Sequence, residues 1–298
     1  MFEFIASIFG YILEFLYNLV NNYGLAIILF TIVIKVILLP MSIKQQKSMK
    51  KNAKLQEKMK AIQFKYKNDQ EKLNKEVMEL YKTEKMGPFS GCITAIVQLL
   101  LLISIFYLVR NPITYMAKIS NEDINNFVEQ VQEDGREISS NYPQIDLIKE
   151  YNWLKERNSE DENVDKLDIQ MNFLGLDLGK IPQQNMSDYK VYIIPILYII
   201  SSFISIRLTT SMQEKTKKDK KVIIDGETGL ELDKKEEPAN EMDTMMQTNK
   251  MMSWMMPIMS ISIAFVAPLG LALYWLVNNI LMIIERLAFN KFLKTEEE

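Results

Sequence analysis

The sequence predicts an all-α integral membrane protein with five transmembrane helices and a cytoplasmic antiparallel helical hairpin. The apolar residues of the 298-residue chain gather in long runs that charged stretches separate. Residues 91–109 hold no charge, and neither does the stretch from Met251 to Ile284. About 20 apolar residues in a helix span the hydrocarbon core of a bilayer. Soluble cores seldom need such uninterrupted runs, so a bilayer is the expected solvent.

The first 21 residues are the first predicted element. They lack the positive region and the small-residue cleavage site of a secretory signal. Glu3 and Glu14 interrupt the apolar residues, and Gly10 weakens the helix. For residues 1–21 we therefore predict an amphipathic helix that lies on the membrane surface, rather than an additional span.

Five spans follow. Three are single apolar runs at 22–42, 91–110 and 191–207. The run from Met251 to Ile284 would measure roughly 50 Å as one helix, which exceeds a hydrocarbon core of about 30 Å. The letters "APLG" at 267–270 supply a break, because proline and glycine end helices. This run therefore predicts two spans, 251–267 and 268–287, joined by a tight turn.

The loop charges predict the topology. Residues 42–90 contain thirteen lysines and six acidic residues, whereas residues 111–190 contain eight basic and sixteen acidic ones. The positive-inside rule places the first segment in the cytoplasm and the acidic segment outside. Lysines in "KTKKDKK" assign the loop 208–250 to the cytoplasm, and Lys291 and Lys294 do the same for the tail 288–298. The N-terminus is expected outside and the C-terminus in the cytoplasm.

The segment 43–90 carries two apolar stripes at helical spacing, which predict two antiparallel helices. The stripes are Leu55, Met59, Ile62 and Tyr66, then Leu73, Val77, Leu80 and Tyr81. Asn68 is expected to cap the second helix, with Glu71 completing a capping box. The hairpin is either a plain connector or a basic platform for ribosomes, anionic lipids or partner proteins. Direct nucleic-acid recognition is not expected, because acidic residues dilute the lysines.

The composition excludes several kinds of chemistry. The chain has no histidine, which removes the Ser-His-Asp triad, the Cys-His pair and histidine-ligated zinc. Its single cysteine, Cys92, cannot form an internal disulfide. No phosphate-binding glycine loop is present. Neither catalysis nor a metal or cofactor is therefore expected.

One lysine lies within an apolar run, in "FTIVIKVILLP" at 30–40. A lysine inside a span costs about 2.5–3.5 kcal/mol on insertion scales. Two readings are open from position alone. The side chain of Lys35 reaches the headgroups five residues before Pro40, or the protein keeps a wet place for it.

Four stretches in order resemble the YidC-type membrane protein insertases. They are "FTIVIKVILLPMSIKQQKSM", "MELYKTEKMGPFSGCITAIVQLLLLISIFYLV", "MNFLGLDLGKIP" and "PLGLALYWLVNNILMIIERL". The resemblance covers residues 22–110 and 171–292, and it is to the bacterial short form without a large N-terminal extracytoplasmic domain. Residues 113–170 match no known pattern, and the long basic tail of some relatives is absent.

The resemblance implies a hydrophilic groove between the five spans, open to the cytoplasm and to lipid but closed to the outside. Such a protein takes in nascent hydrophobic segments and releases them laterally into the bilayer, alone or with the Sec translocon. The implied partners are nascent membrane proteins, membrane lipids, the ribosome and the translocon. The implied location is the plasma membrane of a bacterium.

The resemblance also assigns the groove residues. Lys35 stands where relatives usually have arginine, which keeps the charge but loses the planar five-donor fork. Many relatives have a glutamine near position 205, where this sequence has Ser205, and Ser201 comes one turn before it. The other positions matching polar or substrate-contacting residues are Thr31, Gln98, Tyr274, Trp275 and Asn279.

Other interpretations compete with this one. Thr31, Gln98 and the two serines can each be contacts between helices. A small transporter or channel would use Lys35 as a binding or gating charge. Such a protein often has internal repeats, but the sequence shows no repeat and no second ion within the membrane to pair with Lys35. An intramembrane protease would need Ser201 or Ser205 to meet Lys35.

Overall fold

The computed structural model describes residues 2–66, 69–84, 90–218 and 259–295, although some side chains within these helices are not described. The chain divides into two compact units. The first comprises Met1–Ile37, Leu99–Ser205 and Met256–Glu298, and the second comprises Leu38–Gln98 and Ile206–Met255.

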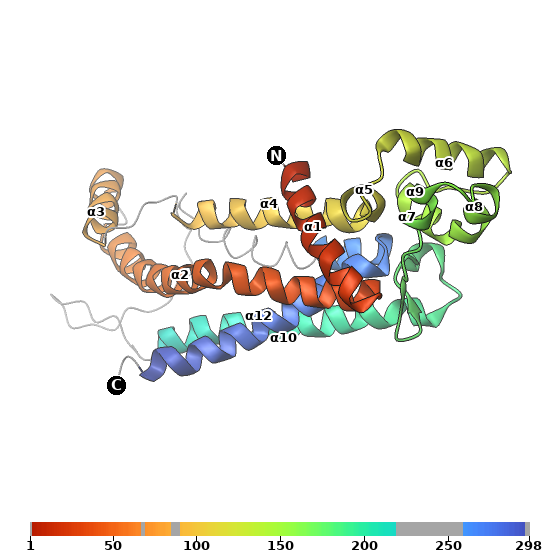
Figure 1. Ribbon diagram of the computed structural model, residues 1–298. Helices are drawn as coiled ribbons and strands as arrows, with labels where there is room; N and C mark the ends of the chain where they lie inside the picture. The colour runs from red at the N-terminus through yellow and green to blue at the C-terminus, as the bar shows by residue number, and fades with distance from the viewer. Residues whose placement is uncertain (1, 67–68, 85–89, 219–258, 296–298) are drawn as a thin grey trace. The chain divides into compact units, whose positions relative to one another are not determined.

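Long apolar helices dominate the described chain (Figure 1). They are α1 (Phe2–Val20), α2 (Tyr23–Lys65), α4 (Ser90–Arg110), α10 (Ile193–Lys218) and α12 (Leu269–Thr295). Four stretches of the described residues are long and apolar enough to cross a membrane, namely Phe2–Val20, Tyr23–Ser48, Tyr189–Leu208 and Leu269–Phe289. A shorter apolar stretch, Leu99–Arg110, lies in α4. The protein is therefore an all-α, multi-pass membrane protein.

Helices occupy the predicted spans as far as the structure describes them. A helix covers 259–266, Ala267 and Pro268 are not helical, and α12 begins at Leu269, so the chain breaks where "APLG" stands. Residues 251–258 of the fourth predicted span lie outside the described residues. Helix α1 is itself long and apolar enough to cross a membrane, so its position on the surface stays a prediction.

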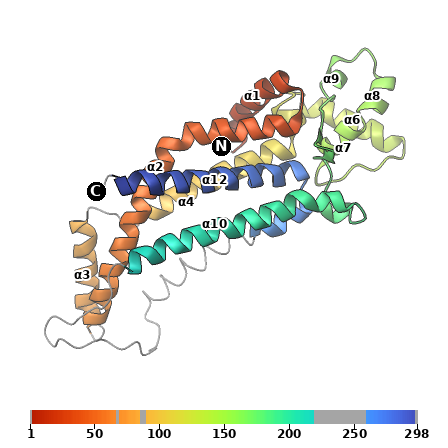
Figure 2. The same cartoon turned by 90° about the horizontal axis from the view of Figure 1, so that it is seen from below.

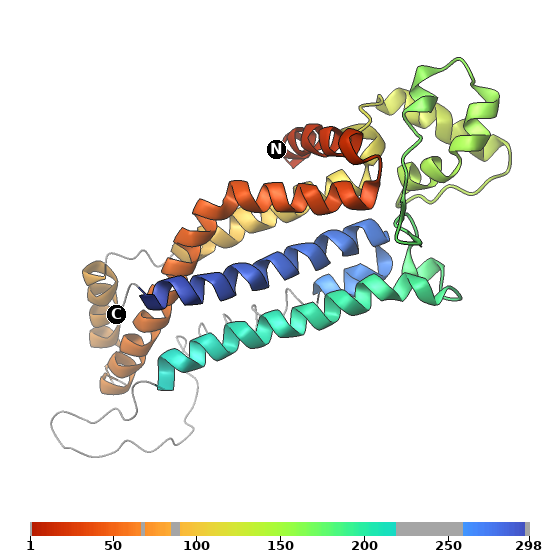
Figure 3. The ribbon, with the colours of Figure 1, turned by 60° about the horizontal axis from the view of Figure 1, so that its bottom comes forward.

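The acidic segment after α4 is a folded lobe at one end of the long helices of the first unit (Figure 3). Its helices are α5 (Pro112–Tyr115), α6 (Asn121–Glu133), α7 (Pro143–Lys149), α8 (Tyr151–Arg157) and α9 (Glu162–Asp165). A hairpin of β1 (Asn172–Phe173) and β2 (Leu176–Asp177) follows, then the 3-10 turns η1 (Pro182–Gln184) and η2 (Tyr189–Tyr192). The lobe has its own apolar core, which includes Phe127, Val131, Ile145, Leu147, Leu154, Val164 and Leu167.

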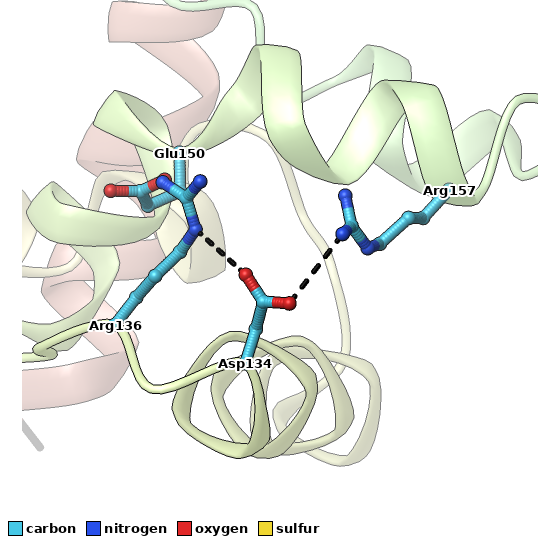
Figure 4. A network of polar contacts seen from close by, with 4 residues as sticks. All are labelled: Asp134, Arg136, Glu150 and Arg157. Atoms are coloured by element: carbon cyan, nitrogen blue, oxygen red, sulfur yellow. Dashed lines mark hydrogen bonds and ion pairs between the residues drawn. The ribbon is translucent and has the colours of Figure 1, made fainter.

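Two arginines join the helices of the lobe across Asp134 (Figure 4). The Arg136 guanidinium lies 3.2 Å from the Asp134 carboxylate and 2.7 Å from that of Glu150. The Arg157 guanidinium lies 3.5 Å from Asp134, and both guanidinium groups stand over the Trp153 ring, at 5.2 and 4.0 Å from its centroid. Exposed ion pairs each contribute little to stability, so the contact of both guanidinium groups with the Trp153 ring is expected to supply much of the stabilisation here.

Backbone hydrogen bonds fix the starts of two spans to this lobe. The N–H groups of Leu269 and Gly270 donate to the carbonyls of Lys180 and Leu178, each at 2.9 Å. The N–H of Tyr23 donates to the carbonyl of Gln170 at 3.0 Å. The first N–H groups of a helix have no partner within it, so these contacts satisfy donors that would otherwise be buried alone. Helices α2 and α12 therefore begin on the same side, against the lobe.

The second unit contains the predicted helical hairpin, with α3 (Gln70–Thr83) following the end of α2. Leu55 and Met59 of α2 and Leu73 and Val77 of α3 are buried. Lys51 and Lys58 of α2 both reach Glu84, just after α3, which fixes the two helices as antiparallel.

The predicted cap of α3 is wrong by one residue. Asp69 is the N-cap, and its carboxylate accepts a hydrogen bond from the Lys72 N–H at 3.1 Å. Aspartate caps a helix as well as asparagine does, so composition alone cannot choose between Asn68 and Asp69.

Candidate functional site

Lys35 of α2 forms an ion pair with Glu285 of α12. Its Nζ lies 3.7 Å from Oε2 of Glu285, and the two side chains are 26% and 11% exposed. The expectation that Lys35 has no ionic partner within the membrane is therefore wrong. Glu285 lies inside the predicted span 268–287, directly after the uncharged run that ends at Ile284, and no role was predicted for it from the sequence. Seven residues separate it from Asn278, which places both on one helix face and was the available signal.

Arg286, beside Glu285, ties α12 to α10. Its Nη1 donates to the backbone carbonyl of Ser205 at 3.0 Å and to the hydroxyl of Ser205 at 3.2 Å. Ser205 is buried. Lys35, Glu285 and Arg286, here called the charged cluster, thus join α2, α12 and α10 and carry one net positive charge.

A second polar group lies two turns earlier along α12. The amide Nδ2 of Asn279 donates to the hydroxyl of Ser202 at 2.7 Å and lies 3.4 Å from that of Ser201. The Ser201 hydroxyl donates to the carbonyl of Tyr198 at 2.8 Å. All three polar side chains are buried, and they link α10 and α12, which lie side by side (Figure 2). Sequence reasoning missed Ser202, although it stands one turn before Ser205 on the face that meets α12.

The aromatic residues of α12 pack beside this group. The Trp275 ring lies 5.8 Å from the Tyr198 ring, centroid to centroid, and Trp275 and Tyr274 are both buried. The indole Nε1 of Trp275 is buried and has no hydrogen-bond partner among the described residues. A buried donor without a partner costs about 1–3 kcal/mol. Such a donor gains a hydrogen bond when a polar group enters beside it.

Two predicted residues do not join these groups. Thr31 is buried in α2, but its hydroxyl donates to the Ile27 carbonyl of the same helix, at 2.6 Å. Gln98 belongs to α4, and its side chain lies outside the described residues.

The contacts do not form a Ser-Lys dyad. Lys35 pairs with Glu285, while the hydroxyl groups of Ser201 and Ser205 contact Asn279 and Arg286. The arrangement instead offers a cation with an exchangeable anionic partner, a buried amide–hydroxyl group and an aromatic pair, all on apolar helices. It can bind an acidic or polar group inside the membrane and release it again.

Comparison with known proteins matches this chain to one family. The model of the 60Kd inner membrane protein family matches residues 15–297. A Membrane protein insertase YidC from Geobacter metallireducens is 47% identical over 87 residues, which are 29% of this chain and 16% of that protein. Those of Syntrophobacter fumaroxidans and Francisella tularensis subsp. novicida are 40% identical over 112 residues and 41% identical over 113, each 38% of this chain and 20% of the relative. The aligned part is thus a fifth or less of the length of these curated relatives.

Proposed function

This chain belongs to the 60Kd inner membrane protein family, and from that premise we propose that it is a membrane protein insertase. It takes nascent hydrophobic segments into a hydrophilic groove open to the cytoplasm and to lipid, and it releases them sideways into the bilayer. The name that the similar proteins carry supports this activity. No covalent bond is made or broken, so the chain needs no catalytic group.

The proposed topology has five spans, at 22–42, 91–110, 191–207, 251–267 and 268–287, with helix 1–21 on the outer surface. The lobe stands outside, and the lysine-rich hairpin stands in the cytoplasm of a bacterial cell. The shared start of α2 and α12 against the lobe is consistent with this, because both helices then run away from the lobe and cross in the same direction. The excess of lysine in 42–90 supports the same orientation.

The observation that carries the proposal is the Lys35–Glu285 pair. Lys35 stays partly exposed within an apolar span and holds an anion at 3.7 Å, which is longer than a close charge-assisted hydrogen bond of 2.7–2.9 Å. In this proposal the carboxylate at Lys35 is exchanged for that of a substrate. An acidic residue of an incoming chain competes with Glu285 for Lys35, and Arg286 stays beside the released Glu285.

The remaining groove residues receive the rest of the segment. Asn279 and the serines of α10 give up their hydrogen bonds to one another and form hydrogen bonds to the polar backbone of the substrate instead. The partnerless Nε1 of Trp275 is the donor with most to gain from this exchange. The family resemblance also assigns Thr31, Gln98 and Tyr274 to the groove. Burial of the apolar segment in lipid then supplies the driving force, about 25 cal/mol per Å².

The ribosome and the Sec translocon are proposed partners at the cytoplasmic face. Exposed lysines on both helices of the hairpin support a basic contact surface, among them Lys44, Lys47, Lys72 and Lys75. A surface of this kind attracts anionic lipid or an acidic surface of a partner by charge and loses that attraction in high salt.

A small transporter or channel is the second candidate. The Lys35–Glu285 pair favours it, because paired ions within a membrane often mark a solute or proton path. The two functions separate in liposomes that contain the purified protein. An insertase makes the tail of an added single-span protein protease-resistant and passes no small solute. Solute flux without tail protection would instead establish the transporter.

A further inference from the structure

Three exposed apolar side chains lie within 16 residues of one another in the sequence, between the core of the lobe and the start of α10. Leu174 is 86% exposed at the tip of the β1–β2 hairpin, Met186 is 68% exposed between η1 and η2, and Tyr189 is 75% exposed in η2. From residue 111 to residue 173, all of which the structure describes, no large apolar side chain is exposed. The apolar surface of the lobe is thus confined to one short stretch, here called the outer patch.

Backbone geometry makes the residue at the hairpin tip unusual. Leu174 and Gly175 have φ angles of 51° and 77°, as a two-residue hairpin turn of the mirror-image type requires. Asparagine is the usual residue before the glycine of such a turn, because a branched side chain is strained at positive φ. A leucine here is both strained and exposed to water. Neither local conformation nor the core of the lobe explains it.

The outer patch lies at the depth of the outer span ends. Phe173, next to Leu174, packs on Gly24 near the start of α2, where its ring leaves no room for a Cβ. The 3-10 turn η2 packs against β2 and leads directly into α10. Its first residue, Tyr189, is also the first residue of a candidate span. The patch is therefore continuous with helix surfaces that lipid covers.

We propose that the outer patch inserts into the headgroup region of the outer leaflet and anchors the lobe to the bilayer. Leu174 and Met186 enter the acyl boundary, and Tyr189 and the exposed Lys190 lie at the headgroups. Tyrosine and lysine are suited to that level, because each has an apolar body and a polar tip. Through Phe173 and Gly24, the anchored hairpin holds the start of α2 at the membrane surface.

Site-directed spin labelling tests this anchor. The single cysteine of the chain allows a Cys92→Ser background into which Leu174→Cys, Met186→Cys or Tyr189→Cys is introduced. Glu160→Cys, an exposed position elsewhere on the lobe, is the matched control. In liposomes the three patch labels should relax severalfold more with oxygen than with an aqueous nickel chelate, relative to the control.

Two results would overturn the proposal. Labels at the patch that respond to the nickel chelate as the control does would place these side chains in water. Dipolar broadening that grows with the protein-to-lipid ratio would instead assign the patch to contact with a second copy of the chain. All three positions are exposed, so the labels do not disturb the core of the lobe.

Discussion

At the scale of single residues, the proposed function depends on how Lys35 is neutralised. A lysine in an apolar helix can reach the headgroups, but here Glu285 of α12 meets it. Because the pair is only partly exposed, removal of one charge leaves the other poorly solvated. We therefore expect the two charges to be coupled in stability.

A double-mutant cycle measures that coupling. Lys35→Ala should lower the free energy of unfolding by more than about 1 kcal/mol, because it removes the ion pair that Lys35 forms with the largely buried Glu285. The double variant Lys35→Ala/Glu285→Ala should recover part of the loss. Thermal melts of the protein in detergent provide the measurement. Strictly additive losses would mean that the two charges do not interact.

At the scale of elements, close approach of two helices explains Gly10. A Cβ on Gly10 would overlap the Tyr115 carbonyl oxygen, and the backbone there cannot move aside as a side chain would. Gly10→Ala should therefore separate α1 from α5 and cost about 1–3 kcal/mol. Ser7→Ala, on an exposed face of the same helix, is the control and should be neutral. Equal melting temperatures for both variants would refute this packing of α1.

The loop before α10 carries a pH-dependent contact. The Lys180 ammonium, 2.9 Å from the Asp188 carboxylate, and the Lys190 N–H hold the pKa of Asp188 below its usual value. This contribution to stability is present above the unfolded pKa, about 3.9, and is lost as pH falls through the lower folded pKa. Asp188→Asn should therefore flatten the loss of thermal stability between about pH 5 and pH 3. If the loss of thermal stability at acid pH is the same in Asp188→Asn as in the parent protein, the contact is not coupled to folding.

Sequence periodicity predicts the elements with long repeats and fails for the short ones. The stripe with Leu55, Met59, Leu73 and Val77 is buried as its spacing indicates. The lobe has helices of four to thirteen residues, most too short to show a repeat, and its core forms only when distant segments meet. Glu285 was missed for a related reason, since only the fold brings it to Lys35.

At the scale of the whole molecule, the lobe organises the starts of α2 and α12. It satisfies the first N–H groups of α2 and α12 and contacts α1 through Lys118 and Glu14. These contacts join the starts of α2 and α12 to the same side of the lobe. In the proposed topology this side faces outward, and the charged cluster lies farther along both helices, toward the cytoplasm.

Cysteine labelling of intact cells tests the orientation. In the Cys92→Ser background, Glu160→Cys in the lobe should react with a membrane-impermeant maleimide, whereas Lys75→Cys in the hairpin should react only after the cells are opened. Both positions are exposed, so accessibility is decided by the side of the membrane alone. The reverse pattern would invert the proposed topology.

The most direct test of the central claim is insertion of an acid-tailed single-span protein into liposomes, scored by protease protection of the tail. The account predicts that Lys35→Ala lowers insertion severalfold, that Lys35→Arg retains it, and that Glu285→Gln raises it at low salt by removing the competing carboxylate. Insertion that depends on the protein but is unchanged by all three substitutions would contradict the exchange of Glu285 for a substrate anion.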